Sequence, residues 1–215
     1  MLSKQSKRIL RPMTYLFAGP MEAGKTYHLM RTVQNLLGTA NPIPFDNGDS
    51  NNNISNGMHG DFSAATFCKP VVDIRTESST IASRNGTIFH GVEALQSLDQ
   101  VHLKENMLVA VDEAQFFDAS LLRLFDRIQD TPGCALVVAG LDRDYKKDPF
   151  GHVLELAQKI VVGPGMGQVN MLRAPCHVST CNAPAGYTKR LVEDDNQILI
   201  GSSEMYVPAC TKHHS

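Results

Sequence analysis

Residues Gly19 to Thr26, GPMEAGKT, carry the phosphate-binding pattern G-x-x-x-x-G-K-[ST]. In such a loop, successive backbone N–H groups surround phosphate oxygens at the start of a helix. Lys25 is then placed to reach the β- and γ-phosphates, and Thr26 to bind Mg²⁺. The pattern predicts a bound nucleoside triphosphate, but it does not tell whether the γ-phosphate is hydrolysed or transferred.

A second candidate for chemistry is NMLVAVDEAQFF, from Asn106 to Phe117, in which an apolar run leads directly into two acids. This pattern is typical of a Walker-B strand, a buried strand that delivers an acid to the Mg²⁺ of the nucleotide. Asp112 is therefore the expected Mg²⁺ acid. Glu113 adds a second carboxylate at the same strand end, where it could act as a general base on a water or a hydroxyl.

The segment TFCKPVVDIR, from Thr66 to Arg75, has the composition of a strand that ends in an acid and a guanidinium. Residues i and i+2 of a strand share a face, so Asp73 and Arg75 could point together into a cleft. They could equally form a solvated ion pair at a strand end, and the spacing alone favours neither interpretation.

Cysteine and histidine gather near the end of the chain. Cys176 and Cys181 form a C-x4-C pair, and Cys210 and His213 form a C-x2-H pair. In a chain with too few cysteines for a disulfide scaffold, two such pairs predict a tetrahedral structural zinc site. The neighbouring His177 and His214 could substitute as zinc ligands, but we interpret each of them as a residue that does not bind the metal.

These groups need elements to position them. An apolar run at 14–19 stops at glycine as a buried parallel strand would, and a helical pattern follows the phosphate loop. That helix carries Leu29, Val33, Leu36 and Leu37 on one face. The other predicted elements are a strand at 66–75, a loop at 75–88, a short helix at 91–98, the strand before Asp112, a helix at 121–129 and a strand at 134–140.

Alternating strands and helices around a phosphate loop predict an α/β fold, a mostly parallel sheet covered on both faces. Ligands gather at the carboxyl ends of the strands in such a sheet. The residues expected at these ends are Lys25, Asp73, Asp112 and Leu141.

Composition sets outer bounds. The chain has 215 residues, is 42% hydrophobic and has a formal net charge of −2, which fits one core domain with a small appended module. The charge argues against a surface built to hold nucleic acid, and no apolar run approaches the roughly 20 residues of a membrane span. We interpret 1–13 as a loose basic tail and the Asn-rich 38–65 as a disordered insertion. A reducing, cytoplasmic setting fits the cysteine usage.

Taken together, the motifs resemble those of the type II thymidine kinases, a cytosolic family. GPMEAGKT, VDEAQFF, GLDRDYKKDPFG and the C-terminal Cys/His pairs follow one another in the family's order, from Leu16 to His213. The most specific part is YTKR, Tyr187 to Arg190, because a generic phosphate-loop protein has no reason to carry it.

The resemblance implies a RecA-like P-loop domain at 14–168 and a zinc domain at 169–215 whose extended lasso closes over the nucleoside. It implies an ATP:thymidine 5′-phosphotransferase that uses Mg²⁺ and a structural Zn²⁺ and acts on thymidine or deoxyuridine. Such an enzyme serves deoxyribonucleoside salvage for DNA synthesis. It further implies a homotetramer, feedback inhibition by thymidine triphosphate, and no nucleic-acid or membrane partner.

The resemblance also implies roles for single residues. Glu113 matches the general base on the sugar 5′-hydroxyl, and Asp73 and Arg75, with Lys25, match groups near the transferred phosphate. Implied ATP and Mg²⁺ contacts are Gly19, Pro20, Met21, Glu22, Ala23, Gly24, Lys25, Thr26, Asp112 and Gln115. Implied nucleoside contacts are Met21, Phe116, Leu141, Phe150, Thr188 and Tyr206, with Gln197, Ile198, Leu199, Ile200 and Gly201 of the lasso meeting the pyrimidine largely through backbone groups. The implied zinc ligands are Cys176, Cys181, Cys210 and His213.

The chain departs from the family pattern in four places. The Asn-rich insertion has no counterpart, some residues near 162–169 look extra, and the first cysteine pair is wider by two residues. Arg143, Asp144 and Tyr145 replace the family's usual residues, a change that could alter the pocket rim or an interface.

Parts of the sequence also fit two rival functions. Asp112 to Gln115 spells DEAQ, which also occurs in helicases, so an ATP-driven nucleic-acid-binding ATPase is one alternative. Such motors usually need two RecA-like domains, and this chain has room for one. The other alternative is an inactive zinc-domain scaffold, which the intact set of Lys25, Thr26, Asp112 and Glu113 argues against.

Overall fold

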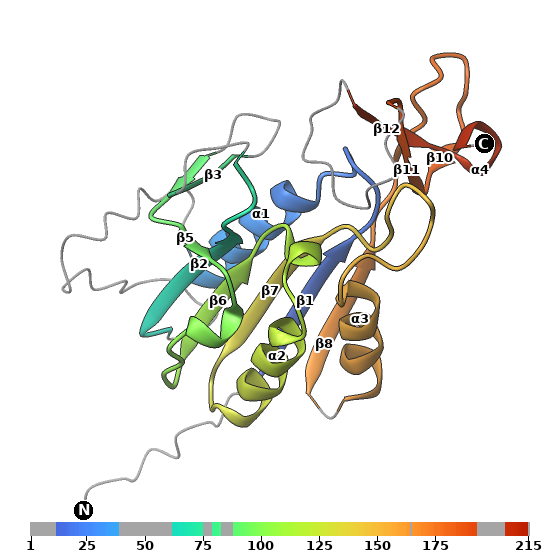
Figure 1. Cartoon of the computed structure of the whole chain (residues 1–215). Helices are drawn as coiled ribbons and strands as arrows, with labels where there is room; N and C mark the ends of the chain where they lie inside the picture. Colours follow the sequence, from blue (N-terminus) through green and yellow to red (C-terminus); the bar gives the residue numbers. More distant parts are fainter. Residues whose placement is uncertain are drawn as a thin grey trace, which may run out of the picture.

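A six-stranded parallel sheet is the centre of the computed structural model, which describes residues 12–38, 62–74, 79–82, 88–163, 165–192 and 205–214. The strands lie in the order β5-β2-β6-β7-β1-β8 (Figure 1). Their bounds are β1 Met13–Ala18, β2 Ala64–Pro70, β5 Glu93–Leu95, β6 Met107–Val111, β7 Ala135–Gly140 and β8 Met166–Met171. The predicted α/β class with a mostly parallel sheet is confirmed.

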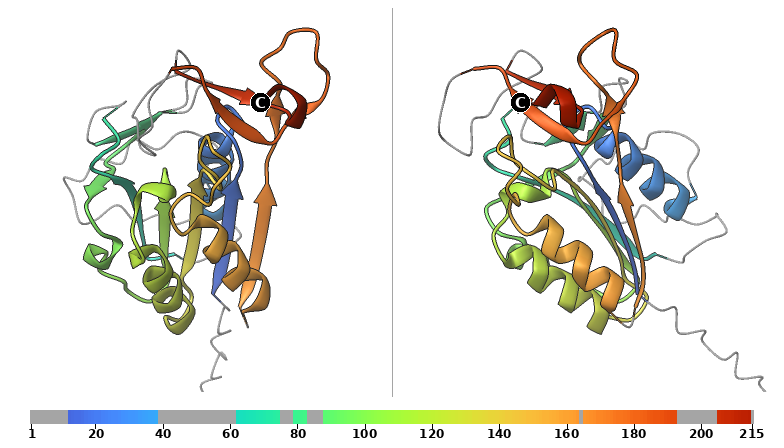
Figure 2. Two further views of the ribbon diagram at one scale, coloured as in Figure 1. Left: turned by 45° about the vertical axis from the view of Figure 1, so that its right-hand side comes forward. Right: turned by 90° about the vertical axis from the view of Figure 1, so that its right-hand side faces the viewer.

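Helices cover both faces of this sheet. α1 (Lys25–Leu37) lies on one face, and α2 (Ser120–Asp130) and α3 (Val153–Val162) lie on the other, as the right-hand view of Figure 2 shows. The predicted apolar stripe of α1 is buried, together with Met30. Every residue of β6 is buried because helices pack on both sides of it, which is why its sequence is continuously apolar.

A small C-terminal module stands beyond the carboxyl end of β1 (Figure 1). It consists of β9 (Ala174–Pro175), β10 (Pro184–Ala185), β11 (Tyr187–Arg190), β12 (Tyr206–Ala209) and the one-turn helix α4 (Thr211–His214). β9 pairs with β10 and β11 with β12, both antiparallel. Two further short strands, β3 (Thr80–Ala82) and β4 (Ile88–His90), form a separate antiparallel ribbon.

Two predicted elements are wrong. The segment 91–98 is not a helix: Glu93 to Leu95 form the edge strand β5, which pairs with Cys68 to Pro70, and a 3-10 turn, η1 (Leu98–Gln100), follows. The predicted loop at 75–88 contains β3 and the first residue of β4. β5 is stabilised by β2, a partner strand distant in sequence, and β3 pairs with β4, the next strand along the chain. Strands this short owe their conformation to their partner, and the local pattern carries no sign of it.

The predicted strand at 66–75 has different ends. β2 begins at Ala64 and stops at Pro70, after which the backbone N–H of Asp73 donates to the carbonyl of Pro70 at 3.0 Å and the chain turns. Asp73 therefore does not lie on the strand, and the shared-face argument for Asp73 and Arg75 fails. Arg75 itself lies outside the described residues.

The sequence also does not predict α3 or β8. β8 adds the edge strand beside β1 and runs to Met171, past residue 168, the expected end of the first domain. The residues that looked extra near 162–169 thus include part of this strand. Most of the predicted insertion, residues 39–61, lies outside the described residues. No described helix is long and apolar enough to cross a membrane.

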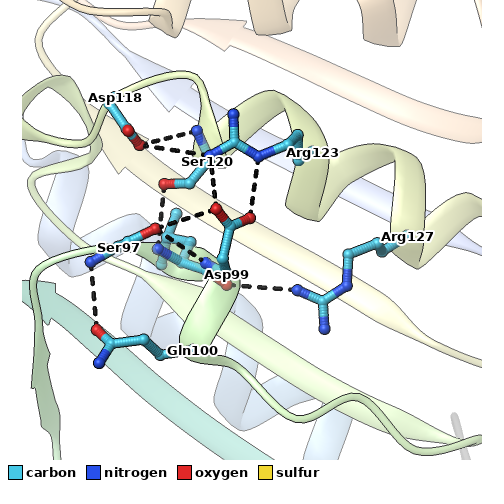
Figure 3. A network of polar contacts seen from close by, with 8 residues as sticks. Ser97, Asp99, Gln100, Asp118, Ser120, Arg123 and Arg127 are labelled. Atoms are coloured by element: carbon cyan, nitrogen blue, oxygen red, sulfur yellow. Dashed lines mark hydrogen bonds and ion pairs between the residues drawn. The ribbon is translucent and has the colours of Figure 1, made fainter.

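A polar network fastens η1 to α2 (Figure 3). Arg123 of α2 donates from Nε to Asp99 at 3.0 Å, and this hydrogen bond lowers the pKa of the Asp99 carboxyl. Arg127 donates to the carbonyl of Leu98. Deeper in the structure, the Oγ of Ser120 accepts the backbone N–H of Leu98 at 3.1 Å, and both residues are fully buried. The network thus holds η1, which precedes β6 in the chain, against α2, which follows β6.

Candidate active site

The phosphate loop joins β1 to α1 and leaves the start of that helix open. Gly24, the residue before α1, has φ 77°, and no side chain caps the helix N-terminus. The first backbone N–H groups of a helix have no partner within it, and with the helix dipole they favour an anion. This arrangement fits the predicted phosphate site at Gly19–Thr26.

Gly19 is required by a close approach rather than by the loop alone. Its φ is 148°, and a Cβ at this position would lie 2.5 Å from the carbonyl oxygen of Leu172. The chain entering the C-terminal module therefore passes directly against the first residue of the phosphate loop. No residue with a side chain fits here without moving that backbone.

The two predicted Mg²⁺ residues lie together. The hydroxyl of Thr26 donates to the carboxylate of Asp112, at 3.1 Å to one oxygen and 3.2 Å to the other. Asp112 is buried at the carboxyl end of β6, beside the first turn of α1. The ammonium of Lys25 lies over the loop, where it donates to the carbonyl of Pro20 at 2.7 Å. A hydroxyl beside a carboxylate is the donor set that Mg²⁺ takes in P-loop proteins.

Glu113 is held in an unusual backbone conformation. Its φ of 51° is left-handed, which an ordinary side chain rarely adopts and which structures tolerate mainly at functional positions. The Nε2 of Gln115 donates to its carboxylate at 2.6 Å. The Oε1 of the same Gln115 accepts the backbone N–H of Leu141 at 2.9 Å. Gln115, which sequence reasoning assigned to ATP and Mg²⁺, thus ties Glu113 to the end of β7.

The loop after β7 packs against the residues that follow β6. Phe116 and Phe150 meet edge to face, with ring centroids 5.5 Å apart, so two predicted nucleoside contacts lie together. Gly151 has φ 56°, and a Cβ there would lie 2.3 Å from the carbonyl oxygen of Gln115. The close packing of these two segments brings Leu141, Phe116 and Phe150 to one edge of the sheet.

The C-terminal module contributes Thr188 to the same region. Its hydroxyl accepts the backbone N–H of Met21 in the phosphate loop at 3.0 Å, which joins two predicted nucleoside contacts. Ala23 of the loop packs in a small apolar cluster with Ala174 and Ala185 of the module. Asp73 lies buried after the turn that follows β2. The predicted lasso residues Gln197–Gly201, like Arg75, are outside the described residues.

The four predicted zinc ligands converge. One ligand atom from each of Cys176, Cys181, Cys210 and His213 lies within 4.8 Å of the other three. The Nδ1 of His213 lies 3.4 Å from the sulfurs of both Cys176 and Cys210. The sulfurs of Cys181 and Cys210 are 3.9 Å apart. Three thiols and an imidazole at such spacing are a structural zinc donor set.

The electrostatics of the cluster also suit a metal. Burial opposes ionisation of the Cys176 thiol, but hydrogen bonds from the backbone at Cys210 and Val178 and from the His213 side chain outweigh it. Together they lower the pKa of this thiol to about 6, and the thiolate is the form that binds metal. The Nδ1 of His177 lies 3.1 Å from the carbonyl oxygen of Pro208, and the His177 ring meets the ring of His213 edge to face, with centroids 6.4 Å apart. His214 contacts the ring of Tyr187 instead.

Sequence reasoning missed one group near the site. The guanidinium of Arg190, within YTKR, packs against the ring of Tyr145 and donates hydrogen bonds to the hydroxyl of Tyr206. Tyr145 had been singled out only as a departure from the family pattern. Nothing in the spacing of these residues connects them, because 45 positions separate Tyr145 from Arg190 and no periodicity spans that distance.

Fold and site define a P-loop α/β protein with a metal acid, a second carboxylate beside it, and a C-terminal module with a metal donor set in contact with the phosphate loop. Comparison with known families makes this more specific. Residues 53–214 match the family model described as "Thymidine kinase", so the chain belongs to the thymidine kinase family.

A curated relative agrees with this family. A thymidine kinase from Mycoplasmoides gallisepticum is 31% identical over 210 residues, an alignment that spans 91% of this chain and 78% of the relative. The predicted family and activity are confirmed: the chain is a transferase that phosphorylates thymidine. The family match begins after the phosphate loop, so the loop's role rests on its own sequence and geometry. The ATPase alternative receives no support.

Proposed function

We propose that the protein transfers the γ-phosphate of ATP to the 5′-hydroxyl of thymidine, with Glu113 as the general base. The observation that carries this assignment is the position of Glu113. Glu113 follows the metal acid Asp112 at the end of β6, and its backbone adopts a strained left-handed conformation. The Nε2 of Gln115 donates a hydrogen bond of 2.6 Å to its carboxylate and so fixes the direction of the side chain. A base must be fixed within reach of the proton it removes, and such strain is expected where a side chain has to be aimed.

The phosphate loop and the residues around it would stabilise the negative charge of the triphosphate. In this proposal the loop N–H groups and Lys25 neutralise the β- and γ-phosphates, while Thr26 and Asp112 hold the Mg²⁺ of the nucleotide. Mg²⁺ would neutralise the charge that develops on the transferred group. Arg75 and Asp73 are proposed beside the transferred phosphate, on the family resemblance alone.

Nucleoside recognition is proposed for the surfaces that meet at the carboxyl edge of the sheet. Met21, Phe116, Leu141, Phe150 and Thr188 would surround the base and sugar, which the contacts of Met21 with Thr188 and of Phe116 with Phe150 support. Tyr206 and the segment Gln197–Gly201 would close over the pyrimidine. A base edge read by backbone groups leaves buried polar groups unpaired when the wrong base enters, so this design favours selectivity.

Zinc is proposed as structural and not as a reactant. Cys176, Cys181, Cys210 and His213 would hold it and join the two ends of the C-terminal module. An ion with four protein ligands keeps no position open for substrate. Its role would be to give order to a module too small to build a sufficient core.

Some wider properties are proposed on the resemblance only. They are a homotetramer, feedback inhibition by thymidine triphosphate, a cytoplasmic location, and a place in deoxyribonucleoside salvage. No nucleic-acid or membrane partner is proposed.

A product assay tests the proposed function. Purified protein is incubated with ATP and Mg²⁺ and with thymidine, deoxyuridine, deoxycytidine, deoxyguanosine or no nucleoside, and ADP and nucleoside monophosphates are resolved. We expect ADP and thymidine monophosphate in equal amounts, with little ADP when nucleoside is omitted. ADP formed at the same rate without nucleoside, or only with an oligonucleotide, would overturn the transfer reaction in favour of the ATPase alternative.

A further inference from the structure

Arg190, the last residue of β11, is held by two tyrosines in the C-terminal module and the loop after β7. Its guanidinium carbon lies 3.7 Å from the ring centroid of Tyr145 and 5.2 Å from that of Tyr206. From the same group, Nε and Nη2 both donate to the hydroxyl of Tyr206, at 3.1 and 2.7 Å. Arg190 is only 9% exposed and Tyr206 only 8%. A cation this deeply buried has to be paired, and these rings and this hydroxyl provide partners.

Arg190 and Tyr206 lie at the end of the ribbon formed by β11 and β12 that is next to the segment 191–205 in sequence. Arg190 is the last residue of β11 and Tyr206 the first of β12, and the two are direct cross-strand partners. The backbone N–H of Leu191 donates to the carbonyl of Met205 at 2.8 Å, immediately beyond this pair. Arg190 and Tyr206 are thus the cross-strand pair of this ribbon that lies next to the segment 191–205 in sequence.

Tyr145 comes from the other part of the molecule. It belongs to the loop after β7, whose shape Asp144 fixes by accepting the backbone N–H groups of Lys146 at 2.8 Å and Asp148 at 3.0 Å. The same loop contacts β11 a second time, with the Nζ of Lys147 5.0 Å from the ring centroid of Tyr187. The loop after β7 therefore contacts both ends of β11, at Tyr187 and at Arg190.

Arginine is suited to this position and lysine is not. A planar guanidinium can stack on one ring, approach a second and still donate two hydrogen bonds in its plane, whereas an ammonium is a point charge with no plane to stack. The two hydrogen bonds also restrict rotation of the Tyr206 hydroxyl and ring. The direction in which Tyr206 presents its ring thus depends on Arg190, and through it on Tyr145.

We propose that Arg190 is a positioning residue for nucleoside selection: held against Tyr145, it fixes the ring of Tyr206, the first residue of β12. Arg190 itself transfers no proton and binds no phosphate in this scheme. The proposal rests on the proposed function of Tyr206 as a nucleoside contact. It assigns a role to Tyr145, a residue that no motif of the chain explained.

Two pairs of variants test it in the full-length protein. Arg190→Lys keeps the charge but loses the stack, and Arg123→Lys makes the same chemical change on the exposed face of α2 as a control. Tyr145→Leu removes the stacking ring, and Tyr145→Phe restores it without the hydroxyl. The measurements are KM and kcat for thymidine, KM for ATP, the ratio of kcat/KM for thymidine over deoxyuridine, and zinc content. The ratio is independent of how much protein is correctly folded, so a merely structural defect does not change it.

We expect Arg190→Lys and Tyr145→Leu to raise KM for thymidine about tenfold, the size expected for one desolvated cation–π contact. We expect both to shift the thymidine-to-deoxyuridine ratio, with KM for ATP and zinc content unchanged and with Tyr145→Phe and Arg123→Lys close to the unaltered protein. An unchanged thymidine KM and ratio in Tyr145→Leu, or a loss of activity that only parallels loss of zinc, would overturn the inference. If the unaltered protein phosphorylates no thymidine, the proposed function fails first and this inference falls with it.

Discussion

The backbone N–H of Met21 donates a 3.0 Å hydrogen bond to the hydroxyl of Thr188, 167 residues further along the chain. Met21 belongs to the phosphate loop and Thr188 to β11 of the C-terminal module, and the hydroxyl is buried. The link places the nucleotide-binding loop and the proposed nucleoside-binding strand in one hydrogen-bonded unit.

Replacing Thr188 tests this link. Thr188→Val keeps the shape but removes the acceptor, so the Met21 N–H loses its partner, and we expect the free energy of unfolding to fall by about 1–3 kcal/mol. Thr188→Ser retains the hydroxyl and should stay within about 1 kcal/mol of the unaltered protein. Urea denaturation of both variants measures the difference. Equal stability of the two would show that the hydrogen bond contributes nothing.

Glu113 is expected to be indispensable for turnover and dispensable for nucleotide binding. Glu113→Ala removes the proposed base, so kcat should fall by about 10²–10⁴-fold. ATP affinity, measured by calorimetry in the presence of Mg²⁺, should change little because the phosphate loop is intact. Near-normal turnover in this variant would remove Glu113 from the mechanism.

Gln115 should act through Glu113. Gln115→Leu keeps the bulk of the side chain but removes both the donor to Glu113 and the acceptor for the Leu141 N–H. We expect kcat to fall by about tenfold or more, since a misplaced catalytic group costs rate. In the Glu113→Ala background the same change should have almost no further effect on kcat. Additive losses in the double variant would argue for an independent role of Gln115.

Metal removal should affect the C-terminal module selectively. We expect one zinc per chain in the purified protein and none in Cys181→Ser, since three ligands bind zinc far less tightly than four. The affinity for thymidine should fall when zinc is lost, because the ion would no longer join the two ends of the module that carries Thr188 and Tyr206. Cys134→Ser is the control, as its buried thiol donates to the carbonyl of Lys104 far from the cluster. Full zinc content in Cys181→Ser would exclude Cys181 as a ligand.

A stability prediction concerns the network of Figure 3. Ser120→Ala leaves the buried N–H of Leu98 without its acceptor, so the free energy of unfolding should fall by about 1–3 kcal/mol. Arg123→Ala breaks exposed ion pairs with Asp99 and Asp118 and should have a smaller effect, because such pairs are screened by water. Thermal unfolding of both variants shows which of them loses more stability. A larger loss in Arg123→Ala would contradict this ranking.

Features with a local physical cause could be predicted from sequence. The phosphate loop, Asp112 after a continuously apolar strand, and the stripe of α1 each follow from residues within a few positions of one another. The zinc donors could be paired by spacing alone, and the structure brings their ligand atoms within 4.8 Å.

Features that depend on distant partners could not be predicted. β5 looked like a helix because its three residues become a strand only by pairing with β2. The strand expected to reach Arg75 ends at Pro70, and only the fold shows that the apolar Val71 and Val72 after it are exposed. The Tyr145–Arg190 stack and the Gln115 bridge unite side chains from different loops, and no pattern within one segment encodes such contacts.

The close approach of Gly19 to Leu172 has a mechanical consequence. Leu172 leads into the C-terminal module and is held in place, with its N–H bonded to the carbonyl of Ala18 at 2.7 Å. If the module swung away as a whole, it would break the alanine cluster around Ala23 and the hydrogen bond from Met21 to Thr188. These contacts surround the triphosphate site itself, so such a swing would dismantle that site with each cycle. We therefore expect the module and the phosphate loop to move together during turnover, and substrates to enter and leave by a route that does not require the two to separate.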